Sequence, residues 1–208
     1  MIKIMVVDDH PIFRQGIFRA FSGEDGLKVV AEAVDGPQFL ENIKKTEVDV
    51  VLLDITMNGE WSLDYLKKVK EDYPKLPVII LSVYPEQHFA LRYIKAGASG
   101  YVTKESPLDD LKHAVRKVAS GGNYLSPSFL EKMAFNASPL DQPPHEKLTN
   151  REFQVFCLLA TGKSLSEIAD KLFVSVKTIS SHRTNILQKL NMESNAEIIQ
   201  YAILNQLI

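Results

Sequence analysis

The sequence is poor in the features that hold secreted proteins together or place proteins in membranes. Cys157 is the only cysteine, so no disulfide can form within the chain, which fits a reducing cytosol. Its neighbours in FQVFCLLA are apolar, and this favours a buried core residue. The apolar runs are too short to span a bilayer, and the N-terminus enters a strand-like segment without a signal peptide. We therefore expect a cytoplasmic protein.

The sequence also lacks a glycine-rich phosphate loop after its first apolar run, which disfavours a nucleotide-binding module. The formal net charge is only −2, so overall charge does not indicate a nucleic-acid partner. One segment differs, because residues 174–190 hold Lys177, Arg183 and Lys189 and no acidic residue. A basic helix in nearly neutral surroundings indicates a surface that faces phosphates.

Residues 1–121 alternate between two kinds of segment. Five short runs rich in Val and Ile are typical of strands buried on both faces. They cover residues 2–7, 28–33, 48–53, 77–82 and 100–103. Segments of helical period follow them at residues 13–21, 37–45, 62–73, 88–97 and 107–122. Five strand–helix units in series predict an α/β domain in which helices cover both faces of a parallel sheet.

The remaining chain reads as a linker and a second domain. Prolines at 127, 139, 143 and 144 interrupt residues 122–146, where we predict a short helix near 128–135 and then a flexible linker. Residues 147–208 show four helical segments and no strand-like run. Their caps are Thr149 or Asn150, Ser164, Ser175 and Ser194. We therefore predict a C-terminal all-α domain of four helices.

Acidic residues stand at the ends of the predicted strands. Asp8 and Asp9 end the first strand and Asp54 ends the third, while Ser82 ends the fourth and Lys104 follows the fifth. The carboxyl ends of parallel strands share one edge of the sheet, so these side chains should meet there. Three converging carboxylates repel one another unless a cation lies between them, and Mg²⁺ prefers such oxygen ligands. His10 has two open interpretations, a metal ligand or a turn residue beside Pro11, and we favour the turn.

Four motifs carry a family resemblance. VDDHP, VLLDITMNG, LSVY and GYVTK occur in the order and spacing of the receiver domain of two-component response regulators, which residues 1–121 resemble. The resemblance implies a flavodoxin-like sheet of strand order 2-1-3-4-5. It implies that a sensor histidine kinase phosphorylates the carboxylate of Asp54. Asp9 and Asp54 would bind Mg²⁺ directly with the carbonyl of Thr56, and Asp8 largely through water.

The same resemblance assigns the residues around the phosphoryl group. Ser82 would donate a hydrogen bond to one phosphoryl oxygen and Lys104 would pair with another. Tyr101 would swing into the space that Ser82 leaves, although an ordinary half-buried strand aromatic is the alternative. Thr56 and Tyr84 occupy the positions that admit the hydrolytic water. Two residues depart from the family pattern, because Asn58 replaces the usual proline and Glu105, not proline, follows Lys104.

The C-terminal segment carries a second resemblance. LTNREFQV and LSEIADKLFVSVKTISSH resemble the helix-turn-helix of the LuxR/NarL/FixJ class, over residues 147–208. The second helix of such a motif enters the major groove of DNA. Its inward stripe is predicted to hold Val176, Ile179, Ile186, Leu187 and Leu190. The resemblance points Ser180, Ser181 and Thr184 toward base edges, places Lys177, Thr178, His182 and Lys189 at phosphates, and allows either role for Arg183.

The last helical segment is the expected dimer surface. Ala196, Ile199, Ala202 and Ile203 lie on one stripe, and the family uses this helix to form a homodimer on DNA. A purely intradomain role is the alternative. The two resemblances together predict a transcriptional regulator of the NarL/FixJ family, which binds promoter DNA when phosphorylated.

Two other classes of protein were weighed against this prediction. Phosphatases of the haloacid dehalogenase type need a second aspartate two residues after the nucleophile, and Thr56 stands there. The protein is therefore expected to accept a phosphoryl group without being a dedicated enzyme. A DNA-binding protein regulated only by partners, or not at all, is the third possibility, and the intact set of acidic residues argues against it.

Overall fold

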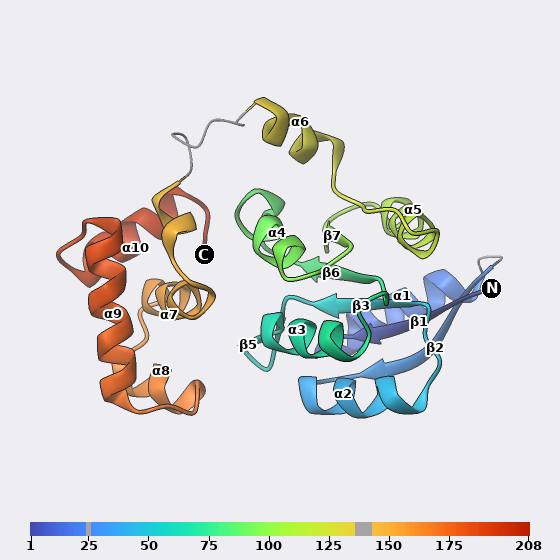
Figure 1. Ribbon diagram of the computed structural model, residues 1–208, viewed down its shortest axis with the longest axis horizontal. Helices are drawn as coiled ribbons and strands as arrows, with labels where there is room; N and C mark the ends of the chain where they lie inside the picture. The colour runs from blue at the N-terminus through green and yellow to red at the C-terminus, as the bar shows by residue number, and fades with distance from the viewer. Residues whose placement is uncertain (24–25, 136–142) are drawn as a thin grey trace. The chain divides into compact units, whose positions relative to one another are not determined.

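The computed structural model describes residues 1–23, 26–135 and 143–208. The chain forms two compact units, Met1–Glu131 and Lys132–Ile208. The first unit is α/β and the second is all-α, as predicted (Figure 1). The predicted flexible linker falls largely on residues 136–142, which lie outside the described residues. None of the helices in the described part of the chain is long and apolar enough to cross a membrane.

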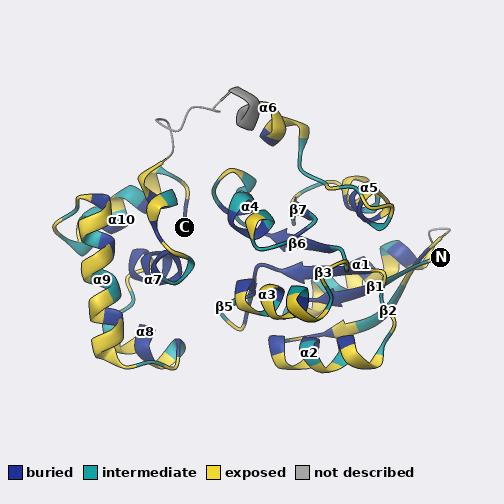
Figure 2. Cartoon of the chain, in the orientation of Figure 1, coloured by how far each residue is buried: buried dark blue, intermediate teal, exposed yellow. Residues whose placement is uncertain are grey.

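The main sheet of the first unit is parallel and has the strand order β2-β1-β3-β6-β7, which is the predicted order 2-1-3-4-5. Its strands are β1 (Ile2–Val7), β2 (Leu27–Ala33), β3 (Val50–Asp54), β6 (Val78–Ser82) and β7 (Gly100–Thr103). Every residue of β3 and β6 is buried, as Figure 2 shows in dark blue. Burial on both faces explains why their hydrophobic runs are continuous instead of alternating.

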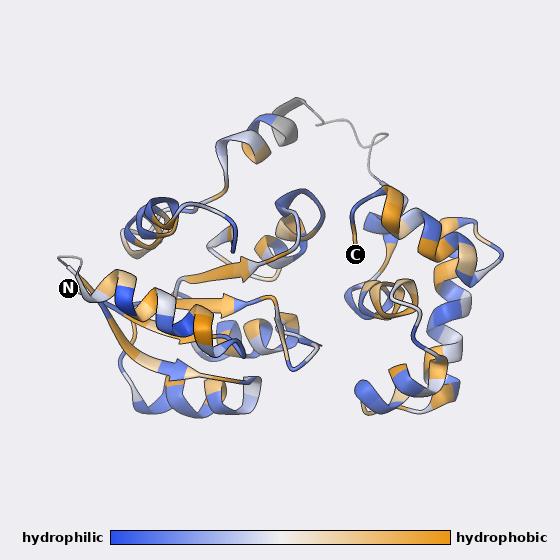
Figure 3. Cartoon of the chain, turned by 180° about the vertical axis from the view of Figure 1, so that it is seen from behind, coloured by the Kyte–Doolittle hydropathy of each residue, from blue (hydrophilic) through white to orange (hydrophobic). Residues whose placement is uncertain are grey.

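Helices cover both faces of this sheet. The helices α1 (Pro11–Ser22) and α5 (Leu108–Ala119) pack on one face, which Figure 3 shows from the α1 side. There Ile17, Phe21 and Leu111 join the apolar side chains of the strands in one core. The other face carries α2 (Gly36–Lys45), α3 (Leu63–Asp72) and α4 (Glu86–Lys95) (Figure 1). This arrangement leaves the carboxyl ends of the strands open at one edge.

A short hairpin between β3 and α3 was not predicted. The strands β4 (Thr56–Met57) and β5 (Glu60–Trp61) pair antiparallel, with Asn58 and Gly59 as the turn. Both turn residues have positive φ, 50° and 75°, as a type I′ turn requires. The hairpin therefore begins two residues after Asp54 and lies at the acidic edge.

The segment after α5 packs back onto the sheet. Tyr124 forms a parallel bridge with Gly100, and its carbonyl accepts a hydrogen bond of 3.1 Å from the amide of Tyr101. The helix α6 (Pro127–Phe135) starts just beyond it. The amide of Ser126 donates to Glu86 Oε1 at 3.0 Å, and the Ser126 hydroxyl bonds the other oxygen. The start of α6 is thus tied to α4 and to β7.

Beyond α6, the described part of the second unit contains a 3₁₀ helix and four α-helices. These are η2 (Pro144–Lys147), α7 (Asn150–Ala160), α8 (Leu165–Lys171), α9 (Val176–Leu190) and α10 (Asn195–Leu204). Thr149, Ser164, Ser175 and Ser194 cap the four α-helices through their side chains, so the predicted helix starts are confirmed. Cys157 is buried in α7, as its apolar neighbours predicted.

Candidate functional site

The predicted acidic cluster forms at the carboxyl edge of the sheet. Asp8 and Asp9 follow β1, and Asp54 is the last residue of the adjacent strand β3. Ligand atoms of Asp8, Asp9, His10 and Asp54 all lie within 4.8 Å of one another. Parallel pairing of β1 with β3 brings together residues that are more than forty positions apart in sequence.

Lys104 supplies the central positive charge of this cluster. Its Nζ lies 2.7 Å from Asp8 Oδ2 and 2.8 Å from Asp54 Oδ2. The amide of Lys104 also donates to the carbonyl of Ser82 at 2.7 Å, which continues the β6–β7 pairing and fixes the backbone beside the site. The sequence-predicted residues Asp8, Asp54 and Lys104 are therefore in direct contact.

The position of His10 is compatible with both interpretations left open for it, a turn residue and a metal ligand. Its amide donates to Asp8 Oδ1 at 2.8 Å and its carbonyl accepts from Arg14 at 3.2 Å, so the backbone makes the turn into α1. Its ring also faces the acidic cluster, with Nδ1 2.8 Å from Asp9 Oδ1 and 3.7 Å from Asp54 Oδ2. The ring remains 66% exposed, so it closes the cluster on the solvent side.

The buried oxygen atoms of the cluster have unused bonding capacity. Asp8 Oδ2 and Asp9 Oδ1 accept no hydrogen bond of regular geometry from the described residues, although Lys104 and His10 lie close to them. Burial and the neighbouring charge of Asp8 raise the pKa of Asp54 to about 6, although Lys104 acts in the opposite direction. Oriented, buried carboxylate oxygens with too little positive charge around them fit a hard divalent cation.

Ser82 and Tyr101 meet through the backbone of Tyr84. The amide of Tyr84 donates to Ser82 Oγ at 2.8 Å, and the Tyr101 hydroxyl donates to the Tyr84 carbonyl at 3.0 Å. Ser82 is fully buried and Tyr101 is only 1% exposed. The alternative for Tyr101, a half-buried strand aromatic, is therefore wrong, because the side chain is buried and its hydroxyl has a hydrogen-bond partner. Its role as a switch residue stays a prediction. Burial raises the pKa of its hydroxyl, which stays protonated as a donor.

An aromatic cluster covers the outer side of this loop. The ring of Tyr84 stacks on Trp61 and Phe89, with centroid distances of 5.9 and 4.8 Å, and Trp61 stacks on Phe89 at 5.2 Å. Trp61 belongs to the β4–β5 hairpin and Phe89 to α4. The side chain of Tyr84 is thus held between the hairpin and α4.

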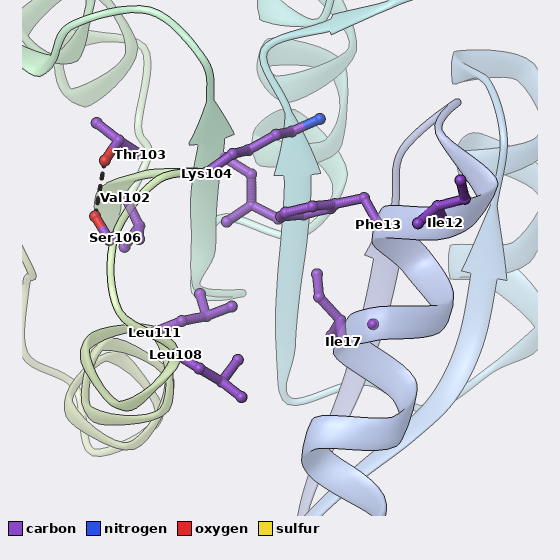
Figure 4. A pocket seen from close by; sticks show the side chains of 11 residues that line it. Ile12, Phe13, Ile17, Val102, Thr103, Lys104, Ser106, Leu108 and Leu111 are labelled. Carbon is purple, nitrogen blue, oxygen red and sulfur yellow. Dashed lines mark hydrogen bonds between the residues drawn. The ribbon is translucent and has the colours of Figure 1, made fainter.

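A hollow of about 380 Å³ lies next to Lys104, between α1 and α5 (Figure 4). The ring of Phe13 supports the Lys104 ammonium, whose Nζ lies 4.7 Å from the ring centroid. Ile12 and Leu108 also line the hollow and are 87% and 41% exposed. The acidic cluster therefore borders an exposed apolar surface.

Two contacts of the site were missed by the sequence analysis, although one had a signal. The amide of Asn58 donates to Asp9 Oδ2 at 2.7 Å. The dipeptide Asn58–Gly59 is a strong hairpin pattern, and it could have predicted the turn that places this amide. The contact of Phe13 with Lys104 had no comparable pattern, because the two residues lie on different elements.

The second predicted site lies on α9. Lys177, Thr178, Ser180, Ser181 and Thr184 are exposed on this helix, as a DNA-reading surface requires, and His182 is half-buried. Arg183 and Lys189 have protein partners, because Arg183 Nε donates to Asn195 Oδ1 and Lys189 Nζ donates to Glu152 Oε2, both at 2.6 Å. Their roles at DNA stay predictions.

Two details of the predicted packing are wrong. Val176 is 45% exposed and does not join the inward stripe of Ile179, Ile186 and Leu190, because it is the first residue of α9 and lies beyond the domain core. Ala202 is fully buried within its own unit, so it cannot belong to an outward dimer stripe. Ile203, another member of the predicted stripe, is 60% exposed, and its neighbour Leu204, which was not predicted, is 74% exposed.

Known protein families match both domains of the chain. Residues 4–116 match the response regulator receiver domain, and residues 146–202 match the bacterial regulatory proteins of the luxR family. The oxygen regulatory protein NreC of Staphylococcus carnosus (strain TM300) is 33% identical over 100% of this chain and 99% of its own length. The response regulator GacA of Pseudomonas aeruginosa is 35% identical over 98% of this chain and 96% of its own.

The fold has solved relatives of similar length. RcsB from Salmonella enterica serovar Typhimurium, bound to promoter rprA in the presence of the phosphomimetic BeF3−, is 26% identical with a TM-score of 0.75. That match covers 96% of this chain and 97% of RcsB. Another structure, ChrA of a heme-sensing two-component system, is 32% identical over the full chain with a TM-score of 0.54.

Proposed function

This chain belongs to the NarL/FixJ family of two-component response regulators, and we propose that phosphorylation of Asp54 controls its binding to promoter DNA. It is a response regulator with a receiver domain and a LuxR-type DNA-binding domain. The observation that carries the proposal is the position of Lys104, whose Nζ bridges Asp8 and Asp54 within 2.8 Å. A carboxylate held this way can act as a nucleophile on phosphorus.

The cation that completes this site is Mg²⁺. Asp8, Asp9, Asp54 and the carbonyl of Thr56 would hold it, since buried oxygens of Asp8 and Asp9 lack regular hydrogen bonds from the described residues. When bound, Mg²⁺ neutralises the charge that gathers on the transferring phosphoryl group. His10, whose ring lies beside Asp9, stays outside this ligand set because Mg²⁺ prefers oxygen ligands to a ring nitrogen.

Asp54, Lys104, Ser82 and Tyr101 would each take part in the transfer of the phosphoryl group. A carboxylate oxygen of Asp54 forms the new bond to phosphorus while the bond between phosphorus and the kinase histidine breaks. The histidine takes the bonding electron pair and leaves as neutral imidazole, because its other ring nitrogen carries a proton. Lys104 then pairs with a phosphoryl oxygen. The Ser82 hydroxyl, which donates to the Tyr84 carbonyl at 3.3 Å, turns its proton to a phosphoryl oxygen, and the Tyr101 hydroxyl loses its fixed partner as that loop moves.

The exposed apolar hollow beside Lys104 is a suitable binding surface for the sensor histidine kinase. The kinase must bring a phosphohistidine to Asp54, and Lys104 lines both the hollow and the acidic cluster (Figure 4). Ile12 stands at this rim and is 87% exposed, which suits an apolar contact that is covered only in a complex. The protein is a phosphoryl acceptor and not a dedicated enzyme.

The helix α9 is the proposed DNA-binding element. Exposed Ser180, Ser181 and Thr184 would face base edges, while Lys177, Thr178 and His182 would meet phosphates. Binding to promoter DNA is supported by RcsB, a family relative that was solved on promoter DNA with a phosphomimetic. Binding as a homodimer, in the cytoplasm, is part of the proposal.

Acetyl phosphate with Mg²⁺ tests the proposal. The wild-type chain should gain the mass of one phosphoryl group, and Asp54→Asn should not, because this nearly isosteric change removes the nucleophile. Chelation of Mg²⁺ should stop the gain in mass. Equal labelling of wild type and Asp54→Asn would overturn the assignment of Asp54.

A further inference from the structure

The β4–β5 hairpin accounts for the departure of Asn58 from the family pattern. Asn58 and Gly59 have φ values of 50° and 75°. Proline fixes φ near roughly −65°, so it cannot occupy position 58 in this turn. The conformation of the hairpin therefore excludes the residue that is usual in the family.

The amide that a proline would lack makes a contact with the acidic cluster. Asn58 N–H donates to Asp9 Oδ2 at 2.7 Å. The other carboxylate oxygen, Oδ1, is buried and lies on the side of His10 and Asp54. One oxygen of Asp9 is thus held by the main chain, and the second faces the cluster.

The hairpin is anchored well enough to hold that amide in place. Ser62, directly after β5, donates to the carbonyl of Ile55 from its amide at 2.9 Å and from its hydroxyl at 3.1 Å. Trp61 stacks on Phe89 and on Tyr84 with interplanar angles of 17° and 14°. The two ends of the β4–β5 segment are therefore tied to each other, and the amide of Ile55 donates to the carbonyl of Leu81 in β6 at 2.8 Å, which fixes them to the sheet. The amide of the turn residue Asn58 reaches Asp9.

We propose that the main-chain amide of Asn58 is a positioning group for Asp9, which holds this carboxylate ready for the divalent cation. The inference rests on the proposed function, because it concerns the same cation site. Only the N–H and the tolerance of positive φ are needed from residue 58, and the amide side chain is dispensable. Partners that hydrogen-bond a metal ligand typically change metal affinity by about 10- to 100-fold when removed.

The test is a calorimetric Mg²⁺ titration of the full chain with three variants. Asn58→Pro removes the N–H and strains the turn. Gly59→Ala strains the turn but keeps the N–H, and Asn58→Gly keeps both. Asn58→Pro should weaken Mg²⁺ binding by about tenfold or more, whereas Asn58→Gly should stay within about twofold of wild type. Gly59→Ala should retain most of the affinity.

Two outcomes would overturn the positioning role. One is Mg²⁺ affinity in Asn58→Pro equal to that of wild type, and the other is an equal loss in Asn58→Pro and Gly59→Ala. Asn58→Pro could have a lower melting temperature than Gly59→Ala, and its loss of Mg²⁺ affinity would then not be specific. An α-hydroxy acid at position 58 replaces only the N–H with an ester oxygen, and it should show the same loss of Mg²⁺ affinity as Asn58→Pro. Intact affinity in that analogue also refutes the inference. A wild-type chain that binds no Mg²⁺ would instead contradict the proposed function.

Discussion

Tyr84 stands two residues after Ser82, and its ring is held in a stack with Trp61 and Phe89 at the edge of the acidic cluster. It offers no carboxylate or amide that could orient a hydrolytic water. Thr56, the other residue beside the water path, has a short β-branched side chain and is fixed in the hairpin by its pairing with Trp61. Both residues should make the aspartyl phosphate long-lived.

We predict that Tyr84→Glu and Thr56→Asn each speed self-dephosphorylation, on the order of tenfold, because each adds a polar group that can orient water. Decay of the phosphorylated chain in excess Mg²⁺, followed on a phosphate-affinity gel, measures the effect. Tyr84→Phe keeps the stacked ring and is the matched control. Equal decay rates in wild type and in both polar variants would refute this explanation of the lifetime.

Different residues of α9 should contact the bases and the phosphates of DNA. The hydroxyls of Ser181 and Thr184 donate to the carbonyls of Lys177 and Ser180, each at 3.1 Å. Their protons are therefore used within the helix, and the oxygen lone pairs remain for the DNA. Acceptors of this kind suit the amino groups of adenine and cytosine in the major groove.

We predict that Ser181→Ala relaxes the preference for one such base pair by about 1 kcal/mol, while the salt dependence of binding is unchanged. Lys177→Ala should instead weaken binding to all sequences and lower the salt slope by about one unit. Titrations of a promoter and a scrambled duplex at several salt concentrations separate the two effects. A changed sequence preference in Lys177→Ala with an unchanged slope would contradict this division.

At the scale of whole elements, one ion pair joins α7 to α9. Glu152 is the third residue of α7, is 4% exposed, and accepts hydrogen bonds from the amide and hydroxyl of Thr149. Lys189 donates to the same carboxylate oxygen from the last turn of α9. Burial alone would raise the pKa of Glu152, but the bonds from Lys189 and Thr149 hold it below its usual value.

This lowered pKa predicts a pH dependence of the second unit. A carboxyl group with a depressed pKa in the folded state stabilises above its unfolded pKa, and the contribution is lost as pH falls through the folded value. Lys189→Met should destabilise α7 and α9 by roughly 1 kcal/mol at pH 7, since Lys189 keeps part of its hydration. The difference from wild type should shrink below about pH 4.

Hydrogen exchange of the α7 and α9 amides, read by mass spectrometry at both pH values, measures this stability. Lys177→Met removes a charge from the exposed side of the same helix and is the control. Equal exchange in Lys189→Met and Lys177→Met would show that the pair with Glu152 adds nothing. If Lys189→Met loses the same stability at both pH values, the cause is lost packing and not the lost charge.

Helices and strands could be predicted from the sequence where the local pattern of apolar and capping residues determines them. The runs of β3 and β6 are continuous because both faces are buried, and the serine and threonine caps of α7 to α10 sit where the sequence placed them. The acidic cluster followed from strand ends alone. Tertiary partners were not predictable in this way. Nothing local to Lys189 indicates Glu152, and the Asn58–Gly59 pattern indicates a turn but not that its amide meets Asp9.

At the scale of the molecule, the DNA-binding domain must be coupled to the proposed phosphorylation site in the receiver domain. The start of α6 is bonded to β7 beside Tyr101 and to Glu86 of α4, so the segment leading toward the DNA-binding unit begins on the elements that contact the loop of Tyr84. Phosphorylation that shifts this loop can shift the population of receivers able to pair. Two paired receivers then hold two DNA-binding domains at high effective concentration.

We therefore predict that acetyl phosphate with Mg²⁺ converts the wild-type chain from monomer to dimer in sedimentation and raises its promoter affinity, while Asp54→Asn stays monomeric. The half-sites should lie about one helical turn, roughly 10 bp, apart, and a shift by about 5 bp should abolish the gain. Leu204→Glu tests the exposed apolar side of α10: it should accept phosphate normally but lose cooperative binding to the paired half-sites. Phosphate-independent sedimentation, or affinity that is indifferent to half-site spacing, would refute control by dimerisation.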